Sequence, residues 1–245
     1  MEIVNFAAQT NQGPFLNTNE DGFDYDLDNE LFMILDGFGG SGRGDKTVLE
    51  LQKNLKKFYT NFVIDRDSTM PFYYSPRYLP EGNALINASL NSHQEVVKKN
   101  SQLELPLRSG ASAIIAAKIE SMMTFVNIGN CRAYILRRGE LTPIFTDDSF
   151  KFLAQDNFES HLKNIPLSAF GLFPDLHYQV REVRVTEGDK ILMITDGVYG
   201  RVTEDELRAC IAKYTLNIKH KIQELFSLAN GRGNLDNQTC MVIEF

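Results

Sequence analysis

Two apolar stretches of the sequence each end in an aspartate followed by a glycine. LFMIL runs into Asp36-Gly37, and KILMIT runs into Asp196-Gly197. A single Asp-Gly step is ordinary turn chemistry, because aspartate hydrogen-bonds to the nearby backbone and glycine accepts a left-handed conformation. Two such steps, each after a strand that reads as buried, predict that both strands deliver a carboxylate to the end of a sheet and then turn sharply.

Two further acidic segments, NED at 19–21 and LDN at 235–237, also lie beside predicted strands. We expect four aspartates to converge at one rim: Asp21, Asp36, Asp196 and Asp236. Carboxylates do not cluster without a positive charge between them. Magnesium and manganese are the hard cations that prefer oxygen ligands. Two such ions about 3.5–4 Å apart activate water and clamp a phosphoryl group, so the pattern indicates metal-assisted hydrolysis.

The elements that must position these residues follow from hydrophobic periodicity and turn signals. We expect helices from near 45, over 83–100, after Thr203 and up to Gly231, and strands over 3–9, 31–35, 112–119, 123–128, 131–137, 141–145, 178–185, 190–195 and 239–245. The pairs GN at 129–130 and RG at 138–139 fit hairpin turns, which predicts an antiparallel meander from 112 to 145. Strands in runs and helices in pairs favour an α+β layered sandwich.

Local signals refine this reading. Thr203 with Glu206 three residues later is typical of a capping box at a helix start. Residues 65–82 hold three prolines and several tyrosines, which predicts an irregular excursion. No linker-like segment divides the sequence, so we expect one domain over residues 1–245.

The composition excludes several functional classes. The net charge is −7, with 43% hydrophobic and 23% charged residues, which disfavours binding to nucleic acid or to anionic membranes. The three cysteines are widely spaced, so neither a thiolate zinc site nor a disulfide framework is indicated. No signal peptide or membrane-spanning run is visible, and we expect a cytoplasmic protein.

The acidic segments belong to longer motifs. ILDGFGGSGRGD resembles the DGxGG signature of the metal-dependent protein phosphatases (PPM, type 2C), and NTNEDGF resembles the first acidic motif of that family. SGASAIIAA, GNCRAYILRRGELTPIFTDDS, GDKILMITDGVYGRVTEDEL and GNLDNQTCMVIEF resemble later family motifs, in the family's order. The resemblance covers nearly the whole chain and is to bacterial-type members.

The resemblance implies a four-layer αββα sandwich of two antiparallel sheets flanked by helices. It implies hydrolysis of phosphoserine and phosphothreonine in proteins by a water that bridges two divalent metals, manganese or magnesium, without a covalent phosphoenzyme. Asp36 would bridge both metals, and the Gly37 carbonyl would ligate one. Asp21 would serve the second metal, and Asp196 and Asp236 would complete the first. The partners would be phosphoproteins made by a serine/threonine kinase, and we expect a monomer.

Other positions match the family less closely. Glu20 would hold a metal-bound water. Asn130 stands where the family usually has an aspartate that helps to hold a third, weaker metal, so that third site is in question. Leu16 stands where a phosphate-binding arginine is usual, so the phosphate clamp is missing or comes from another residue such as Arg43. Phe38 follows the Asp-Gly step, at a position where some members have histidine. This difference distinguishes subfamilies more than it bears on activity.

Two functional hypotheses follow. The chain is an active phosphatase, or it is a pseudophosphatase that keeps the fold and binds a partner or phosphoprotein without turnover. Leu16 and Asn130 favour the second hypothesis. The four retained aspartates favour the first, because carboxylates left without their ion are costly. A different metallohydrolase is disfavoured, since the resemblance runs along the chain. If nothing replaces the arginine, substrate binding would depend on the segments 147–176 and 65–82.

Overall fold

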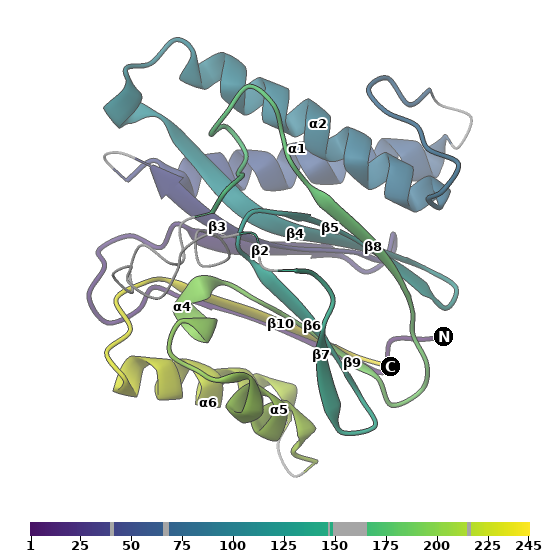
Figure 1. Cartoon of the computed structure of the whole chain (residues 1–245), viewed down its shortest axis with the longest axis vertical. Coiled ribbons are helices and arrows are strands. Elements are labelled where there is room, and N and C mark those ends of the chain that lie inside the picture. The colour runs from purple at the N-terminus through teal and green to yellow at the C-terminus, as the bar shows by residue number, and fades with distance from the viewer. Residues whose placement is uncertain (40–41, 66–68, 147, 149–165, 215–216) are drawn as a thin grey trace.

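The fold is a sandwich of four layers, seen from the side in Figure 1. The structure is a computed structural model that describes residues 1–39, 42–65, 69–146, 148, 166–214 and 217–245. Two helices lie on one sheet, that sheet faces a second sheet, and further helices cover the second sheet. Both chain termini lie at the end of the sandwich opposite to α4 (Asp196–Tyr199). The predicted αββα architecture is confirmed.

Both sheets are antiparallel and have five strands each. The first sheet has the order β2 (Asp21–Asp26), β3 (Leu31–Gly39), β4 (Ser109–Ile119), β5 (Met122–Ile128) and β8 (Gln179–Arg184). The second has the order β1 (Asn5–Asn11), β10 (Gln238–Glu244), β9 (Lys190–Ile194), β6 (Arg132–Arg137) and β7 (Glu140–Pro143).

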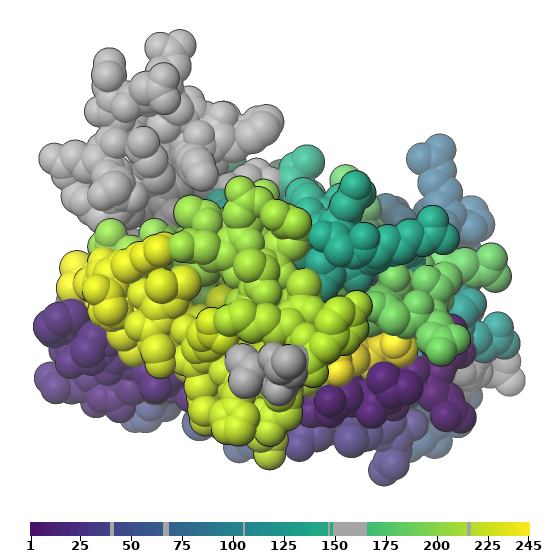
Figure 2. Space-filling view, turned by 90° about the horizontal axis from the view of Figure 1, so that it is seen from below, coloured from purple at the N-terminus to yellow at the C-terminus, as the bar shows by residue number. Residues whose placement is uncertain are grey.

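The helices form the two outer layers. The first sheet is covered by α1 (Gly44–Ile64) and α2 (Pro80–Asn100), and a short 3-10 helix spans Leu105–Leu107. The second sheet is covered by α5 (Glu204–Ala212) and α6 (Ile218–Gly231), which face the viewer in Figure 2. The predicted capping box of α5 is present. Within the described ranges, no helix is long and apolar enough to cross a membrane.

The central strands are apolar on both faces because each is packed between two layers. In β3, Leu31, Met33 and Leu35 pack against α1 and α2, while Phe32 and Ile34 pack against the other sheet. The strands β4, β9 and β10 divide their side chains in the same way. A period of two along each strand therefore fixes which residues face the space between the sheets.

The predicted meander from 112 to 145 is wrong. The hairpin at Arg138-Gly139 is confirmed, with both residues at positive φ as a type I′ turn requires. The step at Gly129-Asn130 is not a hairpin, because β5 pairs with β4 and β8 whereas β6 pairs with β7 and β9. The chain passes from one sheet to the other at this step.

Two other segments differ from the sequence-based expectation. Residues 21–26 form strand β2, where we expected only an acidic turn. The excursion is tied to α2: Asn87 Oδ1 accepts hydrogen bonds from the amides of Phe72 and Tyr73, and Asn83 Oδ1 accepts one from the amide of Ser75. Residues 66–68 of the excursion, and residues 147 and 149–165 of the segment 147–176, lie outside the described residues.

Gly129 gives a test of the passage between sheets. Its φ is +84°, and a Cβ atom there would lie 2.4 Å from Ser112 Oγ and 2.6 Å from the Ser168 carbonyl oxygen. Gly139 has the same φ, but a Cβ there would meet nothing within 4 Å. We expect Gly129→Ala to lower the free energy of unfolding by about 2–4 kcal/mol, from backbone strain plus overpacking. The matched variant Gly139→Ala should lose only about 1–2 kcal/mol. Chemical denaturation measures both, and equal losses would contradict the packing argument.

Candidate metal centre

The sheet register brings Asp21 and Asp36 together. The two residues are direct partners in the antiparallel pair of β2 and β3. Asp36 has the parity of Phe32 and Ile34, so its side chain belongs to the face between the sheets. Like charges placed directly opposite one another destabilise a sheet. The stability of the sheet therefore does not explain why two aspartates face each other here.

The second sheet supplies hydroxyl groups to this pair. Thr195 follows β9 and is fully buried, and its Oγ1 donates a hydrogen bond of 2.8 Å to Asp21 Oδ2. The amide of Thr239 in β10 donates to Thr195 Oγ1 at 2.9 Å. Asp21 is itself buried, so this hydrogen bond spans the interface between the two sheets.

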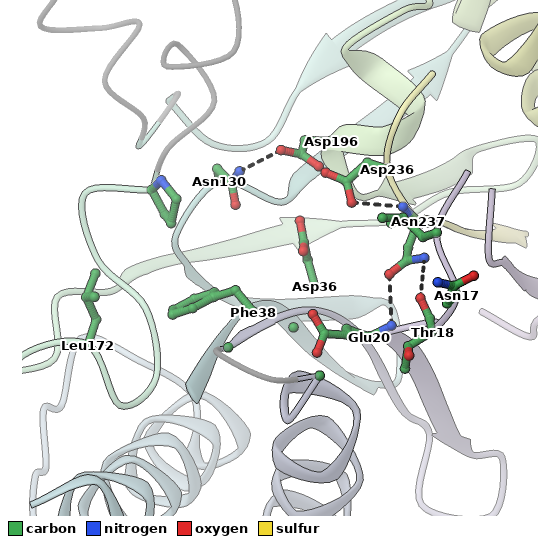
Figure 3. A pocket seen from close by; sticks show the side chains of 15 residues that line it. Asn17, Thr18, Glu20, Asp36, Phe38, Asn130, Leu172, Asp196, Asp236 and Asn237 are labelled. Carbon is green, nitrogen blue, oxygen red and sulfur yellow. Dashed lines mark hydrogen bonds between the residues drawn. The ribbon is translucent and has the colours of Figure 1, made fainter. Parts of the chain in front are cut away.

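Asp196 and Asp236 complete the acidic cluster from the second sheet. Asp196 begins α4 directly after β9, and Asp236 lies in the loop before β10. Figure 3 shows their side chains close together, with the Asp36 side chain pointing toward them. Besides desolvation by burial, repulsion from Asp196 is one of the causes that raise the pKa of Asp36. The structure thus brings all four predicted aspartates to one end of the sandwich.

The two glycines after these aspartates are needed for close packing. Gly37 lies inside β3, which continues to Gly39, so the sharp turn expected there is wrong. At Gly197 the chain has left β9 and turned into α4, and neither glycine has positive φ. A Cβ at position 37 would lie 2.4 Å from the Glu20 carbonyl oxygen. One at position 197 would lie 1.7 Å from the Asn237 carbonyl oxygen. Glycine therefore allows neighbouring backbone to approach each aspartate.

Glu20 is held at the start of α1. Its Oε1 accepts a hydrogen bond of 2.9 Å from the amide of Gly44, the first residue of that helix. A carboxylate is stabilised at this position by the partial positive charge of the helix N-terminus. Desolvation by burial nevertheless raises the pKa of Glu20, and the nearby Asp45 and Asp236 add to the rise.

Asn237 is a positioning residue that the sequence analysis missed. Its Oδ1 accepts from the amide of Glu20 at 2.8 Å, and its Nδ2 donates to the carbonyl oxygens of Gln12 and Thr18 (Figure 3). One buried amide therefore joins the loop that carries Asp236 to the loop that carries Glu20. In the sequence, the position of Asn237 directly after Asp236 was the only indication of this role.

Asn130 lies at the point where the chain passes between sheets. Its Nδ2 donates a hydrogen bond of 3.3 Å to Asp196 Oδ2. Its carbonyl oxygen accepts one of 2.8 Å from the hydroxyl of Tyr199, over whose ring the Arg132 guanidinium lies at 3.8 Å. The amide thus orients Asp196 and adds no negative charge to the cluster.

The acidic cluster forms the floor of a cleft of about 680 Å³. Its lining includes Glu20, Asp36, Gly37, Asn130, Asp196 and Asp236, with Leu16, Phe38 and Leu172 among the other residues. Asp21 is not in the lining and lies buried beneath. Among the described residues the lining contains no lysine or arginine. Arg43 instead lines a separate hollow with Lys46 and Lys99.

The pKa values of the clustered carboxylates indicate that a cation would stabilise them. Desolvation by burial raises the pKa of Asp21 to about 8, although hydrogen bonds from Thr195 and Thr239 oppose the rise. Desolvation, together with repulsion from Asp236, raises the pKa of Asp196 to about 7. Desolvation and the neighbouring aspartates raise the pKa of Asp36 well above its usual range. A cation among these groups would reverse all three effects.

The donor set suits hard divalent cations, because it consists of carboxylate and carbonyl oxygens. In the part of the chain that the structure describes, however, no group of three or more histidine, cysteine, aspartate or glutamate side chains is arranged so that it could hold a metal ion. Asp21 accepts a hydrogen bond from Thr195, and Asp196 accepts one from Asn130. The residues present fit the ions by the chemistry of their oxygen donors.

Comparisons with known proteins identify the family. The family model of protein phosphatase 2C matches residues 11–156, and that of stage II sporulation protein E (SpoIIE) matches residues 86–239. The chain belongs to the protein phosphatase 2C family and is by that membership a PPM-type protein phosphatase. The resemblance seen in the sequence motifs is thereby confirmed.

Individual relatives are distant but cover the chain. The serine/threonine phosphatase stp of Listeria monocytogenes is 23% identical over 96% of this chain and 94% of its own length. The solved structure of PppA, described as a key regulatory component of T6SS in Pseudomonas aeruginosa, superposes with a TM-score of 0.81 at 21% identity, over 98% of this chain and 96% of that one. The catalytic domain of the phosphatase PstP, solved with two manganese ions, has a TM-score of 0.73 at 23% identity, over 99% and 98%.

The raised pKa values predict a stability gain when one carboxylate is neutralised. A raised carboxyl pKa means that stability is highest below the unfolded value of 3.8 and is lost as the pH rises toward the folded value. In chelator at pH 8, Asp36→Asn should therefore raise the free energy of unfolding by about 1–2 kcal/mol, and the gain should shrink toward pH 4. The exposed turn variant Asp28→Asn controls for the loss of one negative charge. Thermal and chemical denaturation at both pH values measure the effect, and a destabilised Asp36→Asn protein at pH 8 would contradict it.

Proposed function

We propose that the chain hydrolyses phosphoserine and phosphothreonine in proteins and uses two divalent cations, manganese or magnesium. The observation that carries this proposal is the gathering of Asp36, Asp196 and Asp236 at the floor of one cleft, with Asp21 buried beneath them and no lysine or arginine in the described lining. The family supports the reaction, since the relative stp of Listeria monocytogenes is named a serine/threonine phosphatase. The two manganese ions of PstP support the cofactor.

Five groups of this chain would hold the ions: the carboxylates of Asp21, Asp36, Asp196 and Asp236, and the carbonyl oxygen of Gly37. When bound, the ions lower the pKa of water and stabilise the charge of a phosphoryl group in transfer. Asp36, at the centre of the cluster, would serve both ions. Glu20, fixed by the amide of Gly44, would position a water at the edge of the site.

The residues around the carboxylates act by orientation. Thr195 donates to Asp21, Asn130 donates to Asp196, and Asn237 holds the loops of Glu20 and Asp236 together. Such partners of metal ligands fix the ligand orientation and typically contribute 10- to 100-fold to affinity or activity. Because Asn130 offers an amide donor where a further carboxylate would serve a third ion, we propose two well-held ions.

The proposed substrates require a serine/threonine kinase to phosphorylate them. We further propose that residues 1–245 act as one catalytic domain and as a monomer in the cytoplasm, because the site takes residues from both sheets of a single chain.

Asp36→Asn and Asp196→Asn test the proposed function. Each should lower the manganese-dependent hydrolysis of an aryl phosphate and of a phosphothreonine peptide by at least about a hundredfold, because metal ions supply several kcal/mol of transition-state stabilisation. Circular dichroism should show that the fold survives, and Asp28→Asn should keep full turnover. Near-normal turnover and metal content in Asp36→Asn would refute the site assignment. Manganese binding without any turnover by the unmodified protein would favour the pseudophosphatase alternative.

Leu16→Arg tests the missing phosphate clamp. Leu16 lines the cleft and its side chain is 38% exposed, so an arginine there has room to reach a bound phosphate. A charge-assisted contact contributes about 1.5–3 kcal/mol, and each ~1.4 kcal/mol is tenfold in affinity. We expect KM for a small aryl phosphate to fall by about one order of magnitude, with a smaller change in kcat, because the contact exists in both ground and transition states. An unchanged KM in a folded variant would mean that position 16 does not reach the phosphate.

A further inference from the structure

Two exposed leucines line the cleft, and three further exposed apolar residues directly adjoin lining residues in the chain. Leu16 and Leu172 line it and are 38% and 39% exposed. Their chain neighbours Phe15 and Phe173 are 65% and 51% exposed, and Leu235, next to Asp236, is 62% exposed. We call these five residues the apolar rim. Exposed apolar groups gathered at one place mark an interaction site, whereas single scattered ones do not.

The rim borders the acidic floor on two sides. Figure 3 shows Leu172 and Phe38 on one side of Asp36, and Asn17 and Thr18 on the other. Leu16 directly precedes Asn17 and also lines the cleft, so it belongs to the second side. A chain that crosses the cleft over the aspartates would meet an apolar side chain before and after the reacting phosphate.

Leu172 is held in place by buried polar contacts. The amide of Gly171 donates to His93 Nδ1 at 3.2 Å, and its carbonyl oxygen accepts from Asn100 Nδ2 at 2.9 Å. On the other side, Gln12 Nε2 donates to the carbonyl oxygen of Leu16. The backbone that carries both leucines is therefore fixed before a substrate arrives, which lowers the entropy cost of binding.

We propose that the apolar rim determines substrate specificity by binding large apolar side chains on both sides of the phosphorylated residue. The substrate class is then phosphoproteins whose phosphoserine or phosphothreonine lies between residues such as leucine and phenylalanine. Acidic neighbours would find no lysine or arginine to pair with in the described lining. The inference rests on the proposed phosphatase function and concerns the same site.

The test compares phosphothreonine peptides of equal length whose flanking residues are leucine and phenylalanine, serine, glutamate or lysine. The unmodified protein, loaded with manganese, should show kcat/KM about ten times higher for the apolar peptide than for the serine peptide. Leu172→Ser should reduce that ratio about three- to tenfold, mainly through KM. Leu27→Ser removes an exposed surface leucine (54%) that lies in the turn after β2 and does not line the cleft, and it should leave the ratio unchanged.

The outcomes separate this inference from the proposed function. Equal rates on all peptides, with normal hydrolysis of an aryl phosphate, would refute the role of the apolar rim in specificity and leave the phosphatase assignment intact. A preference for the lysine peptide would also overturn it, because attraction by the acidic floor would then dominate. If no substrate is hydrolysed, the proposed function is wrong, and fluorescence polarisation with the same peptides still ranks their binding. Phe173→Ser replaces Leu172→Ser if the latter fails to fold, and an unchanged ratio in both variants would refute the inference.

Discussion

The mutual repulsion of four aspartates at one end of the sandwich is the constraint on which the rest of the site depends. Asp21 and Asp36 face each other across a strand pair, and Asp196 and Asp236 approach from the second sheet. Grouping partly desolvated carboxylates raises their pKa values and costs stability. The fold offsets part of this cost with hydrogen bonds from Thr195 and Asn130. The remaining imbalance is what divalent cations would neutralise.

Strands that are buried on both faces hold these aspartates close together in spite of their repulsion. β3 buries apolar side chains on both faces up to Leu35, and β9 does so up to Ile194, which Thr195 separates from Asp196. The backbone that carries Asp36 and Asp196 is therefore anchored in the core. A carboxylate at the end of such a strand cannot easily turn away from its neighbours. The apolar runs LFMIL and KILMI therefore have two linked roles, since they build the core and they also hold the acidic groups at fixed positions.

The sequence predicted the layered fold and the aspartates because both depend on strong local patterns, namely strand periodicity and repeated acidic motifs. It failed where the outcome depends on partners distant in the chain. Strand β2 is short and acidic, and its pairing with β3 overrides its weak local preference. Gly129 reads as a hairpin glycine, but whether β6 pairs with β5 or β9 is decided by long-range contacts. The role of Asn237 arises from backbone groups more than two hundred residues away, so no local pattern reveals it.

Asn130 and Leu16 are best understood together, as two changes that remove charge from the same cleft. The proposed two dications would match four aspartates in formal charge, and an aspartate at position 130 would leave a further negative charge near Asp196. An arginine at position 16 would add positive charge at the opening. With neither present, a phosphate would meet a nearly balanced floor and no side-chain clamp. Long-range electrostatics would then discriminate weakly among phosphoproteins, because attraction of the phosphate depends on the ions alone. Selectivity would then come from the residues beside the phosphate, where the exposed Leu16 and Leu172 line the cleft.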